Sequence, residues 1–426
     1  MKKSLSARDQ EFIWHPYTQM KTTAAPIAIT KGRGAMLYSD DGKSYIDAIS
    51  SWWVNLHGHA HPYIAEKVHN QFQTLEHVIF AGFTHQPAVD LAERLLRILP
   101  GKQSRVFYSD NGSTAVEVAL KMAIQYWHNQ GTKKTKIIVL ENSYHGDTFG
   151  AMSISARSAF TNAFGGLLFD VLTLPFPSDE EKACSELHKI ISNHQEEIAA
   201  FIFEPLVLGT AGMKMYAACT LNKLISICRQ NSVVTIADEV MTGFGRTGKI
   251  FATDYLNVHA DIICLSKGLT GGTMALGVTT CNEEIYSAFL SDDAAKTLFH
   301  GHSYTANPLA CAAANASLDL LLDDKCLKDI NRIAEMQAEF ADTLKMSANT
   351  ENVRNLGTIL AFEVATKAGN SYFSSIRDNL YEFFISEGIL LRPLGNTLYI
   401  MPPYCITNEE LKRVHRAIEK KLEMLR

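Results

Sequence analysis

Short apolar runs alternate with amphipathic segments through the middle of the chain. Five runs are typical of buried strands, at residues 104–110, 136–142, 199–206, 233–240 and 262–267. Helical periodicity lies between them, for example at 112–127 and 217–229. Strands that alternate with helices predict an α/β fold built on a parallel sheet.

The pattern changes outside this region. HPYIAEKVHNQFQTL, at 61–75, predicts a helix with an apolar stripe of Ile64, Val68, Phe72 and Leu75. Near the other end, Thr407 and Glu410 form a capping-box pattern ahead of a stripe made by Leu411, Val414, Ile418, Leu422 and Leu425. The last hundred residues therefore predict a smaller α+β domain.

Composition excludes several classes of partner. The 426 residues carry a formal net charge of −5, so no basic field attracts nucleic acid or anionic lipid. No apolar run reaches the length of a membrane span, and MKKSLSARDQEF lacks the apolar core of a signal peptide. Eight dispersed cysteines without a C-x-x-C pair suit reduced thiols. We expect a cytoplasmic protein.

Polar residues that follow the strands are the candidates for chemistry, because ligands of open α/β sheets bind at the carboxyl ends of strands. Asn111-Gly112-Ser113-Thr114 opens a helix directly after the first strand. Free N–H groups at a helix start bind anions, and Gly112 permits close approach of the backbone. The alternative is a plain helix cap by Ser113 or Thr114.

Two further strand ends carry ionisable groups. Asp238 follows one strand and could pair with a protonated ring nitrogen, or it could be a solvated strand end. Lys267 follows another and could form a Schiff base with an aldehyde, or it could be a surface lysine. A phosphate cradle, a carboxylate and a lysine together match pyridoxal 5′-phosphate. Tyr144 and His145, after a third strand, offer an aromatic face for its ring.

Two other motifs have weaker support from the residues around them. Gly243, Gly245 and Gly248 spell G-x-G-x-x-G, but KIFATDY after them is a poor helix start, which disfavours a dinucleotide site. His57, His59 and His61 could bind a transition metal, but no carboxylate or cysteine cluster accompanies them. We therefore predict no metal site.

Five segments give the chain a family resemblance: NGSTAVEVALKMA, YHGDTFGAMS, ADEVMTGFGRTGK, LSKG and HGHSYTANPLACAAA. With these, it resembles the class III aminotransferases of the fold-type I pyridoxal-phosphate enzymes nearly end to end. The resemblance implies a large domain with a mostly parallel central sheet and a smaller α+β domain from both chain ends. The implied boundaries are 1–55 for the N-terminal arm and part of the small domain, 56–315 for the large cofactor-binding domain, and 316–426 for the rest of the small domain.

The resemblance also implies roles for single residues. Lys267 would bind the cofactor covalently and move the proton, Asp238 would keep the ring nitrogen protonated, Gly112 and Ser113 would bind phosphate, and Tyr144 would stack on the ring. A homodimer is implied, with His302 and Ser303 reaching the phosphate of the neighbouring subunit. The implied substrate-binding residues are Tyr17, Trp52, Tyr144, Asp147, Arg246, Gly301 and Arg392, with Tyr17 also counted as catalytic.

Four segments narrow the expected reaction: WHPYTQM, SSWWVNLHGHAHP, IFAGFTHQPA and RPLGNTLYIMPP. They are similar to class III members that convert 8-amino-7-oxononanoate to 7,8-diaminononanoate in biotin biosynthesis, with S-adenosylmethionine as amino donor. The alternatives are lysine as donor, another ω-aminotransferase, or a non-catalytic scaffold. Two residues depart from the family pattern: Ser303 replaces a usual threonine and keeps the hydroxyl, and Leu208 replaces a common glutamine and receives no role.

Overall fold

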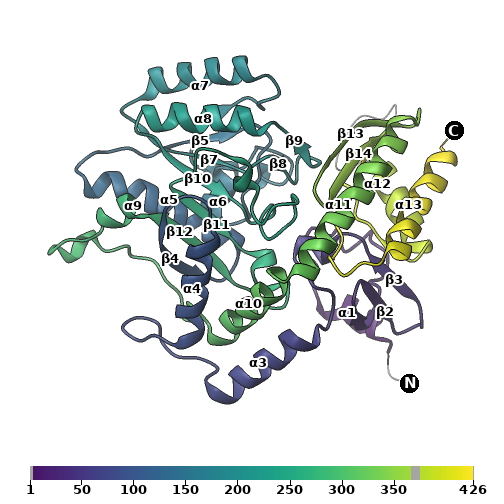
Figure 1. The fold of residues 1–426 in the computed structure, drawn as a ribbon. Coiled ribbons are helices and arrows are strands. Elements are labelled where there is room, and N and C mark those ends of the chain that lie inside the picture. Colours follow the sequence, from purple (N-terminus) through teal and green to yellow (C-terminus); the bar gives the residue numbers. More distant parts are fainter. Residues whose placement is uncertain (1–2, 366–374, 426) are drawn as a thin grey trace.

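The structure, a computed structural model, describes residues 3–365 and 375–425. In these ranges seven strands form the central sheet, in the order β4-β12-β11-β10-β7-β5-β6 (Figure 1). They are β4 (Gln103–Ser109), β5 (Lys136–Leu140), β6 (Leu172–Leu174), β7 (Ile198–Phe203), β10 (Val234–Asp238), β11 (Ile262–Leu265) and β12 (Gly277–Asn282). Strand β12 is antiparallel to both its neighbours, and the pairs from β11 to β6 are parallel. The predicted α/β sheet is confirmed, although the sequence pattern missed β6 and β12.

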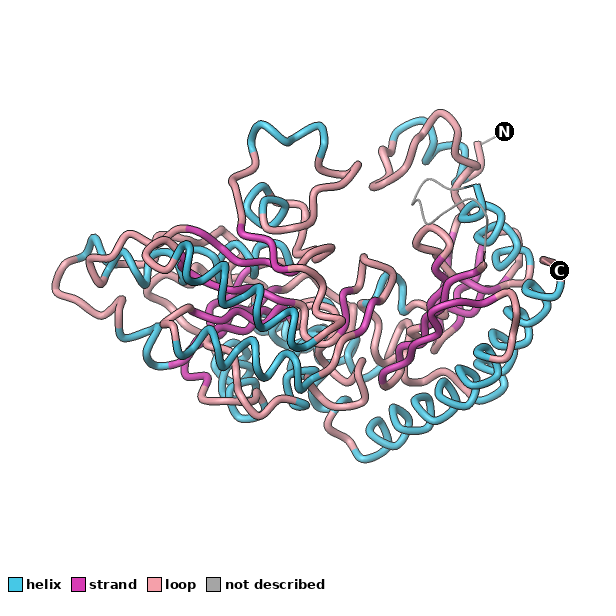
Figure 2. The backbone as a smooth tube through the Cα atoms, turned by 90° about the horizontal axis from the view of Figure 1, so that it is seen from above, coloured by secondary structure: helices cyan, strands magenta, loops and turns pink. Residues whose placement is uncertain are grey.

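Both faces of this sheet are apolar. In β5, Ile137 and Val139 pack into the cluster that contains α5, whereas Ile138 and Leu140 belong to the cluster on the opposite face. Because successive side chains of a strand point to opposite faces, a sheet between two helical layers needs continuous apolar runs. Figure 2 shows helices on both sides of the strands. The helices of this part of the chain are α3 (Pro62–Thr74), α4 (Gln86–Ile98), α5 (Gly112–Asn129), α6 (Phe149–Ser153), α7 (Glu180–His194), α8 (Ala218–Gln230), α9 (Glu283–Ser287) and α10 (Pro308–Leu321).

The two ends of the chain lie side by side (Figures 1 and 2). One sheet has the order β1-β2-β3-β15, so a strand near the C-terminus pairs with N-terminal strands. Its strands are β1 (Ile29–Arg33), β2 (Met36–Ser39), β3 (Ser44–Asp47) and β15 (Ile389–Leu390). A second sheet contains β13 (Thr350–Leu356), β14 (Ile359–Val364) and β16 (Thr397–Ile400). The helices of these regions are α1 (Leu5–Phe12), α11 (Asp324–Lys345), α12 (Ser375–Ser386) and α13 (Asn408–Glu423). The expected domain boundaries stay a prediction.

Two predicted helices can be compared with the structure. The capping box of α13 is confirmed, since Thr407 and Glu410 bond each other's backbone N–H groups, and its stripe is buried apart from Leu425. The stripe of α3 is only partly buried: Ile64 packs beside α10, but Phe72 is 62% exposed. No helix among the described residues is long and apolar enough to cross a bilayer.

Candidate active site

A cavity of about 470 Å³ opens at the carboxyl ends of β4, β5, β7, β10 and β11, where ligands of α/β sheets bind. Each of these strands is followed by residues that line it. They include Asn111, Gly112 and Ser113 after β4, Tyr144 and His145 after β5, Glu204 after β7, Asp238, Val240 and Thr242 at the end of β10, and Ser266 and Lys267 after β11. The sheet thus brings together five of the predicted cofactor residues: Gly112, Ser113, Tyr144, Asp238 and Lys267.

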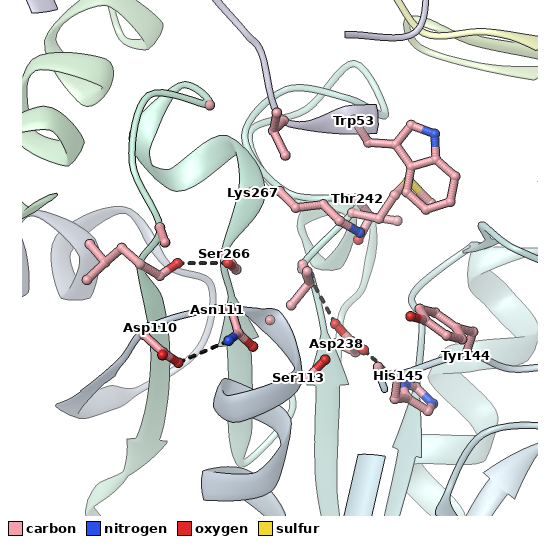
Figure 3. A pocket seen from close by; sticks show the side chains of 18 of the residues that line it. Trp53, Asp110, Asn111, Ser113, Tyr144, His145, Asp238, Thr242, Ser266 and Lys267 are labelled. Carbon is pink, nitrogen blue, oxygen red and sulfur yellow. Dashed lines mark hydrogen bonds and ion pairs between the residues drawn. The ribbon is translucent and has the colours of Figure 1, made fainter. Parts of the chain in front are cut away.

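Lys267 points into this cavity. Its side chain extends between Trp53 and Asp238 (Figure 3), and its Nζ lies 4.6 Å from the centre of the Trp53 ring system. Burial lowers the pKa of Lys267 from 10.5 to about 8, although the carboxyl groups of Asp238 and Glu204 oppose that effect. A lysine with this pKa has an appreciable neutral fraction near pH 7, which is the form that attacks an aldehyde.

Asp238 forms the floor of the cavity and is 5% exposed. Its Oδ2 lies 2.7 Å from Nδ1 of His145, and its Oδ1 accepts the backbone N–H of Val240 at 3.1 Å. These two contacts fix the carboxyl group before any ligand binds. A carboxylate held in a buried site is a suitable partner for a cationic ring nitrogen.

The first turn of helix α5 is the candidate anion site. The cap is Asn111, whose side chain accepts the N–H of Thr114 at 3.0 Å, so the alternative of a plain cap by Ser113 or Thr114 is wrong. The first intrahelical bond is from the Ala115 N–H to the Asn111 carbonyl, which leaves the N–H groups of Gly112 and Ser113 ahead of it. A Cβ on Gly112 would lie 2.7 Å from Cγ1 of Val240. The backbone and its glycine therefore fit a closely held phosphate.

Four other predicted residues, Tyr17, Asp147, Trp52 and Arg392, form a chain of contacts that begins at Tyr144. The hydroxyl of Tyr17 donates to Oδ2 of Asp147 and lies 3.4 Å from the hydroxyl of Tyr144. The ring of Tyr17 meets the Trp52 ring system edge-on, with 5.7 Å between centres. The Arg392 guanidinium lies 4.7 Å from the same tryptophan ring system. The aromatic side chains Tyr17 and Trp52 thus lie beside both a carboxyl group, that of Asp147, and a guanidinium cation, that of Arg392.

Other predicted residues lie outside the cavity lining. Arg246 is 1% exposed and faces the back of the tryptophan segment, where its Nη2 donates to the carbonyls of Trp53 and Asn55 at 3.1 Å. Gly301, His302 and Ser303 do not line the cavity of this subunit, and His302 Nδ1 accepts the N–H of Tyr304. Their expected role depends on a second subunit.

Glu204 is a cavity residue that the sequence reading missed. It follows β7, accepts the N–H groups of Tyr144 at 3.0 Å and Gly209 at 2.9 Å, and is buried. Burial raises the pKa of its carboxyl group to about 7. The rule that polar residues at strand ends are candidates for chemistry, which selected Asp238, applies equally to Glu204, because it directly follows the apolar residues 199–203. Leu208, which stands where the family commonly has glutamine, lies four residues after Glu204 and is fully buried.

The glycine motif at 243–248 and the histidines at 57 and 59 have other structural roles. The segment 243–248 forms turns and leads into a 3-10 helix at Ala252–Tyr255, so it lacks the helix start of a dinucleotide site. His57 bonds Ser317, and His59 bonds Asp47. The described residues contain no cluster of histidine, cysteine and acidic side chains that could hold a metal ion.

The donor set of the cavity fits pyridoxal 5′-phosphate. The first turn of α5 suits the phosphate, Asp238 suits the ring nitrogen and Lys267 suits the aldehyde. A Cβ at Gly112 would clash with Val240, another residue of the cavity lining, so the start of this helix has no room for a side chain.

Known proteins share this architecture. A protein named adenosylmethionine-8-amino-7-oxononanoate aminotransferase from Synechococcus elongatus is 47% identical over 419 residues, covering 96% of this chain and 98% of that one. A Helicobacter pylori protein of the same name is 37% identical, with 100% and 99% covered. The structure of a Methanocaldococcus jannaschii protein, also of that name, superposes with a TM-score of 0.93 at 36% identity and covers 98% of both chains. An omega transaminase from Pseudomonas jessenii in complex with PMP gives 0.92 at 25% identity, with 99% and 98% covered. Residues 17–422 match the family described as Aminotransferase class-III, and the chain belongs to that family.

Proposed function

We propose that this aminotransferase uses pyridoxal 5′-phosphate to transfer an amino group from S-adenosylmethionine to 8-amino-7-oxononanoate, which gives 7,8-diaminononanoate for biotin biosynthesis. The observation that carries the proposal is identity along almost the whole chain: 47% and 37% to two relatives named for this reaction. All eight cysteines are free, which suits a reducing compartment such as the cytoplasm.

The cofactor residues have separable tasks. When bound, pyridoxal phosphate supplies an aldehyde carbon for amine exchange and a cationic ring that withdraws electrons. Gly112 and Ser113 hold its phosphate through backbone N–H groups and the hydroxyl of Ser113. Asp238, fixed by His145, holds the proton on the ring nitrogen. Lys267 would take the proton from the Cα atom of the donor and deliver it to the former aldehyde carbon of the cofactor, because its pKa near 8 permits both protonation states at neutral pH.

The aromatic wall would hold two dissimilar substrates. Trp52 and Tyr17 offer broad apolar faces to the carbon chain of the oxononanoate, and Arg392 offers a planar fork to its carboxylate. Asp147, which Tyr17 holds in place, offers a negative charge to the ammonium group of the donor. The same aromatic faces could attract the sulfonium centre of S-adenosylmethionine.

Two alternatives share the fold. The omega transaminase superposes nearly as well as the M. jannaschii protein, at 0.92 against 0.93, so the backbone does not discriminate between substrates. Lysine could also replace S-adenosylmethionine as donor. The test is a half-reaction: the purified holoenzyme receives S-adenosylmethionine, lysine or 4-aminobutyrate, and the absorbance of the cofactor is followed. The proposal expects the cofactor absorbance to be lost with S-adenosylmethionine and to return when the oxononanoate is added. If only lysine or only 4-aminobutyrate bleaches the cofactor, that compound is the amino donor and the proposal is wrong.

We also propose a homodimer in which His302 and Ser303 of the partner subunit complete the phosphate site, beside Gly301 of the partner subunit. Several large apolar side chains are exposed in a single subunit, among them Phe72, Ile79, Phe83 and Phe299. Analytical ultracentrifugation of the purified protein gives its mass in solution and so tests whether it is a dimer. Mixing inactive Lys267→Ala with inactive Ser303→Asp subunits tests the sharing, because a hybrid dimer would regain one intact site.

A further inference from the structure

Residues Ser50–Trp53 form a left-handed helical turn, α2. Their φ angles are 52°, 45°, 71° and 76° in chain order. The turn is closed by backbone bonds from Trp53 N to the Ile49 carbonyl at 2.9 Å and from Val54 N to the Ser50 carbonyl at 3.0 Å. Left-handed helix is unfavourable for every L-residue because Cβ crowds the next carbonyl, and none of the four is glycine. Contacts from outside must therefore hold this turn.

Asp47 provides such contacts at the start of the turn. Its carboxyl group is fully buried at the end of β3. Oδ1 accepts the N–H of Ser51 at 2.9 Å and that of Ile49 at 3.3 Å, and Oδ2 accepts the hydroxyl of Ser51 at 2.7 Å. His59 Nε2 lies 2.9 Å from Oδ2 on the other side. One carboxyl group thus binds the backbone and the side chain of the same left-handed residue.

The rest of the turn is held by its neighbours. The Ser50 hydroxyl donates to the Met401 carbonyl at 2.8 Å and accepts from Arg246 at 3.0 Å. Arg246 also binds the Trp53 carbonyl, and Trp53 Nε1 donates to the Tyr399 hydroxyl at 3.0 Å. The turn is therefore held at both ends, because Asp47 binds Ser51 and Arg246 binds both Ser50 and Trp53.

This geometry sends two consecutive tryptophans to different places. Trp53 is 4% exposed and covers Lys267 in the cavity (Figure 3). Trp52 is 39% exposed and lies between Tyr17 and Arg392. The handedness of the turn sets the direction of each Cα–Cβ bond. A right-handed turn would therefore point the side chains of Trp52 and Trp53 in other directions.

We propose that Asp47 is a positioning residue of the substrate site, which holds the left-handed turn so that Trp52 and Trp53 form the wall against which substrate binds. The proposal deepens the function proposed above and rests on it for the identity of the substrate. Asp47 touches no reacting atom; its effect passes through Ser51 and the two rings.

Kinetics of Asp47→Asn test the role in binding. The amide keeps one acceptor but brings an N–H group toward the donors of Ser51, so we expect KM for the oxononanoate to rise roughly tenfold while kcat changes less than about threefold. Asp41→Asn, in the neighbouring β2–β3 turn, is the matched control and should leave both unchanged. A lowered melting temperature with KM unaltered would reduce Asp47 to a structural residue and overturn the proposal.

A second comparison uses Ser51→Gly and Ser51→Ala and keeps the proposal testable if Asp47 variants fail to fold. Both lose the hydroxyl bond to Asp47, but only glycine relieves the left-handed backbone, so Ser51→Gly should melt about 1–2 °C above Ser51→Ala. KM should rise in both. The reverse order of melting temperatures would show that the turn is not left-handed in solution.

Tryptophan fluorescence tests whether Asp47 holds the turn, independently of which reaction the enzyme catalyses. The chain has four tryptophans, so Trp14→Phe and Trp127→Phe leave only the two in the turn. In that background, Asp47→Asn should shift the fluorescence of the apoprotein to longer wavelength as the rings meet water. If the parent enzyme does not aminate the oxononanoate, the proposed function fails, while this shift still decides whether Asp47 holds the turn; an unchanged spectrum would reject that role.

Discussion

His145 Nδ1 lies 2.7 Å from Oδ2 of Asp238, although the two residues follow strands that are not neighbours in the sheet. β7 runs between β5, which precedes His145, and β10, which ends at Asp238. The pair therefore spans the end of a third strand, and Glu204, just beyond that strand, holds the N–H of Tyr144, the residue before His145. The orientation of the Asp238 carboxyl group is thus fixed by three strand ends at once.

Asp238→Asn should remove the charge that holds a proton on the cofactor ring. The amide is nearly isosteric and can keep a bond to His145, so we expect the fold to survive while kcat/KM falls roughly 10²–10³-fold, the size of other losses of transition-state charge stabilisation. Single-turnover absorbance with the amino donor measures the loss. Asp170→Asn, on an exposed loop, should change nothing. Retention of a tenth of the parental kcat/KM by the Asp238 variant would contradict this assignment.

Lys267→Ala should abolish covalent attachment of the cofactor. Borohydride reduction of the parent enzyme with pyridoxal phosphate, followed by denaturation and peptide mass spectrometry, should label the peptide that contains Lys267. The alanine variant should bind the cofactor only reversibly and carry no label. Lys249→Ala serves as control, because its Nζ lies near Tyr255 and Asp254, outside the cavity lining. Labelling of any other lysine in the parent would move the nucleophile elsewhere.

The pKa of Lys267 predicts how reconstitution depends on pH. Burial lowers it from 10.5 to about 8, so the amine of the folded apoenzyme loses its proton at lower pH than in the unfolded chain. The rate constant for covalent cofactor attachment should rise about tenfold per pH unit below pH 8 and level off above it. Stopped-flow absorbance between pH 6.5 and 9.5 measures the profile. A rate that keeps rising to pH 10 would show an unshifted lysine.

The same shift predicts a stability change in the apoprotein. Between pH 8 and 10.5 the unfolded chain binds more protons at this lysine than the folded one, so stability increases with pH across that window. Lys267→Met should lose this dependence and gain stability at pH 7, where the parent has to bury a charged amine. Urea unfolding of both apoproteins at pH 7 and pH 10 checks the sign. Equal differences at both pH values would rule out a depressed pKa.

Particular residues show what the sequence could predict. The five strands were predictable because continuous apolar runs are needed in a sheet covered on both faces, and the strand-end rule then selected Lys267, Asp238 and Gly112. Strand β12 was missed because its buried residues include Thr279 and Thr280, whose hydroxyls are satisfied by Ala115 and Gln103, distant in the chain.

Other features depend on contacts that no local pattern encodes. Tyr17 meets Asp147 across 130 residues, so only the family resemblance suggested its place. The left-handed turn at Ser50–Trp53 has no glycine to mark it and exists because Asp47 and Arg246 bind it. Local preference would have opposed this conformation, and tertiary contacts override it.

Tyr17→Phe should remove the hydrogen bond that holds the carboxyl group of Asp147 beside Tyr17. The variant keeps the ring against Trp52 but loses the hydroxyl that donates to Asp147. We expect KM for the amino donor to rise roughly tenfold, because Asp147 is no longer held toward an ammonium group, with a smaller effect on KM for the oxononanoate. Steady-state kinetics with each substrate varied in turn gives both values. Equal increases for the two substrates would place Tyr17 in general packing.

Gly112→Ala should weaken cofactor binding through sterics alone. The new methyl group would lie 2.7 Å from Cγ1 of Val240 and 3.4 Å from its Cγ2, so either the first turn of α5 or Val240 must move. Because that turn presents the N–H groups for phosphate, we expect the dissociation constant of pyridoxal phosphate to rise roughly 10–100-fold, which equals about 1.4–2.8 kcal/mol. Gly165→Ala is the matched control, since its Cβ would meet no atom within 4 Å. Equilibrium dialysis of the apoprotein gives the constants, and adding Val240→Ala to the Gly112 variant should restore part of the affinity if the clash is the cause.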